Sequence, residues 1–167
     1  LHHVSGFMPW WRHQTWGAQH YWISHSMMHS PIKLKEFSES LSNKYRRPLI
    51  TSLVPTQLAN LIDTRYGLEW LKSLSVIWVG GASISSDLAN KARKEAINLA
   101  PCYGSTETAA MVTCLSPKDF LNGSNSVGFP LEDVEIDINN RNSLKIKTNR
   151  IALSKSKNNK FESIADS

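Results

Sequence analysis

Cysteine is scarce in this chain of 167 residues, which contains only Cys102 and Cys114. Two isolated cysteines provide neither the spacing of a zinc site nor the framework of a small disulfide-rich domain. This excludes protein classes that depend on cysteine for their structure. A reducing cytosol is compatible with the composition, and the expected location is cytoplasmic.

Long hydrophobic runs are also absent. No stretch approaches the roughly 20 apolar residues that cross a bilayer, and the first residues lack the basic and then apolar order of a signal peptide. With 41% hydrophobic and 20% charged residues the composition is typical of a globular protein. Because the chain starts at Leu1 instead of Met and stops at Ser167 without a helix-ending signal, we expect an internal fragment.

The positive charge is not accompanied by the aromatic residues that stack on bases. A formal net charge of +5 can indicate a nucleic-acid partner. Much of the excess lies late, in Lys145, Lys147, Arg150, Lys155, Lys157 and Lys160. These residues stand among Ser and Asn, without interleaved aromatic residues. We therefore expect no nucleic-acid partner, and we interpret these late basic residues as part of a solvated loop.

Strand and helix patterns alternate through residues 1–125. Leu34, Phe37 and Leu41 have helical spacing, and Pro55 suits the first turn of a second helix that is expected to stop at Gly67. A buried strand is expected at 48–54, and short strands are expected at 74–79 and 99–102, with a helix capped by Ser85 or Ser86 before the last of them. This order predicts an α/β fold in which helices pack on a parallel sheet.

Residues 126–167 have a different pattern, that of a β-hairpin followed by a loop. Val134, Ile136 and Ile138 alternate with acidic residues, and Leu144 and Ile146 alternate with lysines. Five polar residues, 139–143, connect the two runs. Acidic side chains on one strand can pair with basic ones on the other.

Two glycine-containing loops follow predicted strands. Ligands of open parallel sheets bind beyond the carboxyl ends of the strands. One loop holds Gly80, Gly81 and Ala82, and the other holds Tyr103, Gly104, Ser105, Thr106, Glu107 and Thr108. Glycine lets the backbone approach a ring or phosphate, Tyr103 offers a stacking face, and Glu107 is a hard oxygen ligand for Mg²⁺. Together they predict a nucleotide site.

Simpler interpretations exist for the same residues. Gly80-Gly81 can be a tight turn, and Ser105-Thr106-Glu107 can be a helix cap with an acid in the first turn. His25 and His29 are spaced i, i+4, which can hold a metal on a helix face, but no third ligand is evident. We interpret them as surface or packing residues.

Three motifs in order resemble the adenylate-forming superfamily of acyl-CoA synthetases, luciferases and peptide-synthetase adenylation domains. Residues 103–108 resemble its Tyr-Gly-x-Thr-Glu signature, residues 78–82 its Gly-Gly-Ala loop, and residues 126–136 its Gly-x-Pro turn with the strand after it. The likeness runs from about residue 1 to 147. It implies the large N-terminal domain of such an enzyme, with ATP, Mg²⁺ and coenzyme A as its cofactors and substrates.

The resemblance implies roles for individual residues. Tyr103 would stack on adenine, with Gly104 and Ser105 beside it; Thr106 would touch the α-phosphate, and Glu107 would hold Mg²⁺. Gly80, Gly81 and Ala82 would border the adenine and the acyl group.

The start of the chain resembles one subgroup, the o-succinylbenzoate–CoA ligases of menaquinone and phylloquinone synthesis. The similar segments are 1–12 and 51–58. By this resemblance His3 would line the acyl pocket, although His2 and His3 can also be ordinary loop residues. The alternatives are another acyl- or aryl-CoA ligase, a peptide-synthetase adenylation domain, or a non-catalytic nucleotide-binding module.

The resemblance also implies what lies outside the chain. The phosphate-binding loop is expected before residue 1, and the ribose-binding Asp and the domain with the catalytic Lys after residue 167. We therefore expect this chain alone to be inactive.

Overall fold

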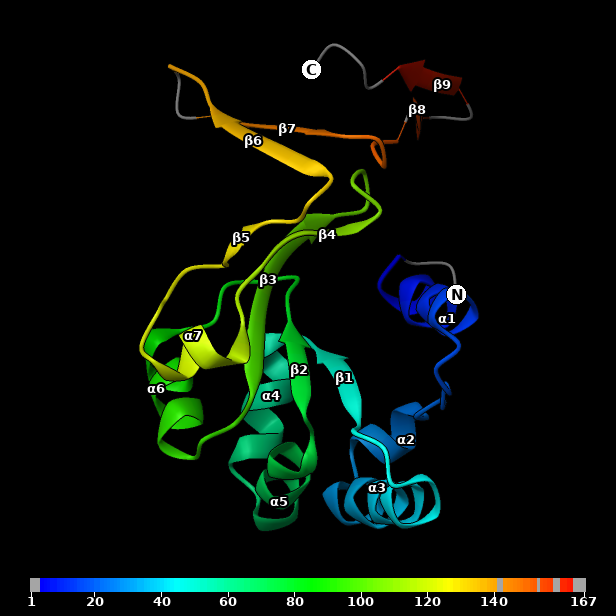
Figure 1. Cartoon of the computed structure of the whole chain (residues 1–167), viewed down its shortest axis with the longest axis vertical. Helices are drawn as coiled ribbons and strands as arrows, with labels where there is room; N and C mark the ends of the chain where they lie inside the picture. The colour runs from blue at the N-terminus through cyan, green and yellow to red at the C-terminus, as the bar shows by residue number, and fades with distance from the viewer. Residues whose placement is uncertain (1–3, 141–142, 153, 158–159, 164–167) are drawn as a thin grey trace. The chain divides into compact units, whose positions relative to one another are not determined.

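The computed structural model describes residues 4–140, 143–152, 154–157 and 160–163 (Figure 1). The helices are α1 (Val4–Trp16), α2 (His25–Met28), α3 (Pro31–Tyr45), α4 (Pro55–Ile62), α5 (Arg65–Ser73), α6 (Ser86–Lys94) and α7 (Pro117–Leu121). The strands are β1 (Ile50–Leu53), β2 (Val76–Val79), β3 (Leu99–Ser105), β4 (Ala110–Cys114), β5 (Phe129–Pro130), β6 (Val134–Ile138), β7 (Leu144–Thr148), β8 (Ser154–Lys157) and β9 (Lys160–Ser163). Among the described residues, no helix is long and apolar enough to cross a membrane.

Strands β1 to β5 form one sheet in the order of the chain. The first three are parallel: Leu53 is level with Val79, and Val79 with Pro101. Helices α4 and α5 connect β1 to β2, and α6 connects β2 to β3. This confirms the predicted α/β fold with a parallel sheet and packed helices.

The described chain divides into two compact units. One comprises Tyr21–Tyr103 and Cys114–Phe129, and the other comprises Leu1–His20, Gly104–Thr113 and Pro130–Ser167. The predicted division between 1–125 and 126–167, drawn from the change in sequence pattern, stays a prediction.

The unit of residues 21–103 and 114–129 contains an apolar core. Helices and strands both contribute to it because their apolar residues recur at the helical or strand period. Its largest buried side chains are Leu34, Leu58, Trp70, Leu71, Ile77, Ile97, Leu99 and Phe120. The indole N–H of Trp70 donates to Ser38 Oγ at 2.7 Å, so its polar atom is satisfied inside the core.

The hairpin of β6 and β7 belongs to the other unit and has the predicted register. Glu135 is level with Lys147, and Asp137 is level with Lys145. Lys147 Nζ lies 3.0 Å from Glu135 Oε2, with both side chains largely exposed. The expected pairing of acidic and basic strands is therefore confirmed for this pair.

Gly67 does not end the helix that begins at Pro55. That helix, α4, ends at Ile62, and Gly67 lies inside α5, where Thr64 Oγ1 accepts from its backbone N–H at 3.1 Å. A Cβ on Gly67 would lie 2.2 Å from the carbonyl oxygen of Leu61. Glycine is needed here because two helices meet closely. A glycine in the sequence does not by itself distinguish such a contact from the end of a helix.

Two strand predictions also need correction. β1 is not a buried strand, since only Leu53 is buried and Ile50 is 48% exposed; β1 is the first strand of the described sheet and pairs there with β2. Residues 154–157 and 160–163 are not loop but the antiparallel strands β8 and β9, with Lys155 level with Glu162. Backbone pairing requires no apolar alternation, so the sequence pattern gave no sign of it.

Candidate adenine-nucleotide site

Gly80 and Gly81 form the turn directly after β2. The backbone N–H of Gly80 donates to the carbonyl of Leu53 on β1 at 3.3 Å. On its other side, a Cβ on Gly80 would lie 3.0 Å from Cys102 Sγ on β3. Gly81 has φ +82°, which disfavours any residue with a Cβ. The chain bends at Gly81 and Ala82, and the glycine backbone without a Cβ is compatible with a ligand lying against it.

Tyr103 lies on the strand beside this turn. Because Val79 is level with Pro101 in the parallel pair, the chain after β2 leaves the sheet next to Cys102 and Tyr103. Cys102 Sγ donates to the carbonyl of Val79 at 3.5 Å, which ties the two strands together there. Tyr103 is 42% exposed. The structure thus brings Gly80, Gly81 and Tyr103 to the same end of two neighbouring strands.

The predicted end of β3 near Cys102 is too early. Tyr103, Gly104 and Ser105 belong to the strand, and the turn comprises residues 106–109. A Cβ on Gly104 would lie 2.0 Å from the carbonyl oxygen of Ala110. The glycine of the motif therefore lets the returning chain of β4 come close, and this contact continues the strand through the motif.

Thr108 shapes the turn and was not given a role from the sequence. It is 3% exposed, and its Oγ1 accepts from the backbone N–H of Ser105 at 3.1 Å and lies 3.0 Å from the carbonyl of Ala110. A helix cap at Ser105-Thr106-Glu107 is excluded, because the turn leads into strand β4. The sequence signal for this role of Thr108 was its place as the second Thr of the motif, two residues after Thr106.

The turn is strained. Ala109 has φ +50° and Ala110 has φ +98°, both in the left-handed region that residues with a Cβ avoid. Such residues typically cost about 1–3 kcal/mol each and persist only where their surroundings hold them; they cluster at functional sites.

Thr106 and Glu107 are neighbours in this turn. Thr106 is exposed and Glu107 is half-buried, while the Glu107 carbonyl accepts from the backbone N–H of Ala152 at 2.7 Å. Within the described part of the chain, no three His, Cys, Asp or Glu residues gather as a metal site. Proteins commonly bind Mg²⁺ through one or two carboxylates, while phosphates and water complete the shell.

Four histidines were singled out from the sequence. His2 and His3 lie outside the described residues. His25 and His29 lie with their Nε2 atoms 3.3 Å apart, on exposed residues. The two rings contact each other, in keeping with their interpretation as surface residues.

Residues 1–149 match the sequence profile of the AMP-binding enzyme family, and the chain belongs to this family. The 2-succinylbenzoate–CoA ligase of Staphylococcus epidermidis is 36% identical over 91 residues, which are 54% of this chain and 19% of that protein. The class that the motifs predicted is thereby confirmed.

Solved structures share the fold. Wild-type E. coli MenE with a bound phenylether-linked analogue of OSB-AMS has a TM-score of 0.67 and 28% identity, covering 97% of this chain and 32% of that one. The o-succinylbenzoate coenzyme A synthetase of Bacillus subtilis in complex with ATP and magnesium ion has a TM-score of 0.65 and 23% identity, covering 89% of this chain and 31% of that one. The chain thus spans about a fifth to a third of the length of these relatives.

Proposed function

We propose that this chain carries the adenine-binding and magnesium-binding part of an acid–thiol ligase that converts o-succinylbenzoate to its coenzyme A thioester. The observation that carries the proposal is the placement of Gly80, Gly81 and Tyr103 at adjacent ends of parallel strands, followed by a strained turn with Thr106 and Glu107, in a member of the AMP-binding family. Relatives named as 2-succinylbenzoate–CoA ligases support the substrate.

The proposed reaction has two steps. A carboxylate oxygen of the acid attacks the α-phosphorus of ATP, and the bond to pyrophosphate breaks. The thiol of coenzyme A then attacks the carbonyl carbon of the acyl-adenylate, and AMP leaves. Both steps depend mainly on positioning and on stabilising charge that develops on phosphate oxygens.

Each site residue has a distinct task. Tyr103 stacks on the adenine that lies against the bare backbone of Gly80, Gly81 and Ala82. The Thr106 hydroxyl donates to an α-phosphate oxygen. The Glu107 carboxylate holds Mg²⁺, which neutralises phosphate charge when bound. Gly104 and Ser105 keep this turn in place, and His3 lines the acyl pocket.

The product serves quinone biosynthesis, and the partners are the small carboxylate, ATP and coenzyme A. A cytoplasmic location fits these substrates. Another acyl- or aryl-CoA ligase activity is the second candidate.

Pyrophosphate release with a panel of acids tests the proposal. The full protein in which this chain occurs is supplied with ATP, Mg²⁺ and, in turn, o-succinylbenzoate, anthranilate, a medium-chain fatty acid and an amino acid. We expect the fastest release with o-succinylbenzoate, dependent on Mg²⁺. Faster release with another acid would move the protein to that substrate, and no release with any acid would favour a non-catalytic nucleotide-binding module.

A further inference from the structure

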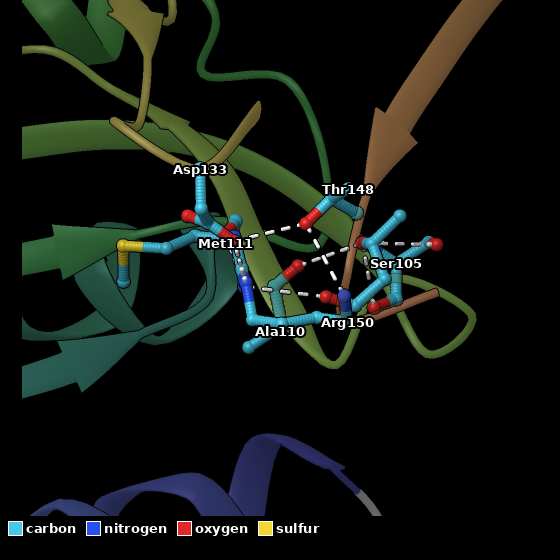
Figure 2. A network of polar contacts seen from close by, with 7 residues as sticks. Ser105, Ala110, Met111, Asp133, Thr148 and Arg150 are labelled. Atoms are coloured by element: carbon cyan, nitrogen blue, oxygen red, sulfur yellow. Dashed lines mark hydrogen bonds and ion pairs between the residues drawn. The ribbon is translucent and has the colours of Figure 1, made fainter. Parts of the chain in front are cut away.

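A group of polar residues from distant parts of the sequence contacts the motif turn. We call Asp133, Thr148, Arg150 and Ala152 the brace. Asp133 precedes β6, Thr148 ends β7, and the other two follow β7. Figure 2 shows Arg150 close to Asp133, Ala110 and Met111. All of these residues belong to one compact unit.

Arg150 contacts the motif turn at two backbone positions. Its Nη1 lies 3.3 Å from the carbonyl oxygen of Thr108 and 3.1 Å from that of Met111. These two carbonyls flank Ala109 and Ala110, the residues with positive φ. The guanidinium thus holds the main chain on both sides of the strained segment. The ammonium group of a lysine would do this less well, because its donors are not arranged in a plane.

Asp133 fixes the guanidinium from the opposite side. Arg150 Nε lies 2.6 Å from Asp133 Oδ2, and Nη2 lies 3.2 Å from Oδ1, which makes a bidentate pair (Figure 2). Thr148 Oγ1 donates to Asp133 Oδ2 at 2.9 Å. Hydrogen bonds from Arg150 and then Thr148 lower the pKa of the Asp133 carboxyl. The carboxylate is therefore charged at neutral pH, and the pair is intact where the enzyme would act.

A second contact reaches the residue that would hold Mg²⁺. The backbone N–H of Ala152 donates to the carbonyl of Glu107 at 2.7 Å. The brace consequently contacts the main chain of Glu107, Thr108 and Met111, which covers most of the turn. Arg150 contacts the turn from about 40 positions away in the sequence, so the conformation of the turn depends on distant residues as well as on Thr108.

We propose that Arg150, held by Asp133, is a positioning residue for adenylate formation. It keeps the strained turn in the conformation that presents Thr106 and Glu107 to the phosphates. This proposal rests on the proposed function. It concerns two residues that lie outside the sequence motif and act through its main chain. A turn with two alanines at positive φ relaxes when its holding contacts are removed, and small displacements of catalytic groups are costly in rate.

The test compares Arg150→Ala, Arg150→Lys and Asp133→Asn in the full protein in which this chain occurs. Lys147→Met is the matched control, because Lys147 lies on the same hairpin and loses only an exposed ion pair with Glu135. We expect the three brace variants to lower kcat for pyrophosphate release by roughly ten- to a hundredfold with a smaller change in KM. The control should equal the wild type.

Chemical rescue separates positioning from simple stabilisation. Guanidinium ion, at concentrations far below those that unfold the protein, should restore part of the kcat of Arg150→Ala, whereas ammonium ion should not. Lower kcat without rescue, or full activity of Arg150→Lys, would overturn the proposal. So would brace variants that keep wild-type kcat.

Hydrogen exchange tests the proposed positioning role of Arg150 without requiring catalysis. Peptides that contain residues 105–111 should exchange faster in Arg150→Ala than in Lys147→Met, while peptides from α4 and α5 remain unchanged. Equal exchange would overturn the proposal even if the wild type activated no acid. An inactive wild type with faster exchange in Arg150→Ala would instead count against the proposed function and leave the brace supported.

Discussion

In the unit of residues 21–103 and 114–129, stability comes from large apolar side chains such as Leu58, Trp70 and Phe120. In the unit that contains residues 104–113 and 130–152, the buried residues described include three threonines, and an arginine holds the main chain. Gly80 and Gly81 belong to the apolar unit, and Thr106 and Glu107 belong to the polar one. An apolar core tolerates many sequences, whereas a polar network fixes one geometry.

The largest expected effect is loss of the apolar core. Trp70→Ala removes a side chain that is 1% exposed and should lower the free energy of unfolding of the chain by about 3–5 kcal/mol. Urea unfolding followed by circular dichroism measures this. Trp70→Phe keeps a ring but loses the hydrogen bond to Ser38, and it should be clearly milder. Equal losses for both variants would show that the core does not stabilise this unit by packing.

A smaller effect is expected in the turn itself. Thr108→Val keeps the shape but leaves the backbone N–H of Ser105 and the carbonyl of Ala110 without their side-chain partner, at about 1–3 kcal/mol. Adenylate formation should fall with it, since the turn carries Thr106 and Glu107. A Thr108→Ser variant retains the hydroxyl and is the control. If valine and serine behave alike, the hydroxyl does not hold the turn.

The brace should also respond to acid. The pKa of Asp133 is lowered in the folded protein, so its contribution to stability is present above the ordinary pKa of an aspartate and is lost as pH falls through the lowered value. Asp133→Asn should therefore destabilise the protein at neutral pH and flatten the decline in stability at acid pH. Unfolding curves at a series of pH values measure this. Parallel pH curves for the two proteins would contradict it.

The smallest effect is expected at the surface of the hairpin. The Lys147–Glu135 pair is largely exposed on both sides, and such pairs contribute less than about 1 kcal/mol. Lys147→Met should therefore leave the unfolding midpoint nearly unchanged, and any change should vanish in high salt. A large loss that persists in salt would show that Lys147 stabilises the hairpin through contacts other than its exposed ion pair with Glu135.

The same comparison explains how far the sequence could predict the structure. Periodicity in residues 33–102 predicted helices and parallel strands, because a buried face repeats at a fixed interval. It placed the end of α4 wrongly at Gly67, since glycine marks close packing as well as helix ends. The strained turn escaped prediction, because nothing local marks Ala109 and Ala110 for positive φ, and Arg150 contacts the turn from about 40 positions away.

The candidate site could be predicted from the sequence only in part. Motif residues Tyr103, Gly80 and Gly81 could be placed together because parallel strands end on one side. The roles of Thr106 and Glu107 rest on side-chain chemistry and on the family resemblance, and they stay proposals. Thr108 could have been recognised as a turn residue, since threonine hydroxyls often bond nearby backbone.

Magnesium-dependent adenylate formation by Glu107→Gln tests the central claim most directly. The substitution keeps the size and hydrogen bonding of the side chain but removes the charge that holds Mg²⁺. The full protein in which the chain occurs should lose on the order of 10²-fold or more in adenylate formation and need more Mg²⁺ for half-maximal rate. Glu36→Gln, the same change on an exposed residue of α3, should behave as the wild type. A Glu107→Gln rate within about threefold of wild type, at unchanged Mg²⁺ demand, would contradict the assignment.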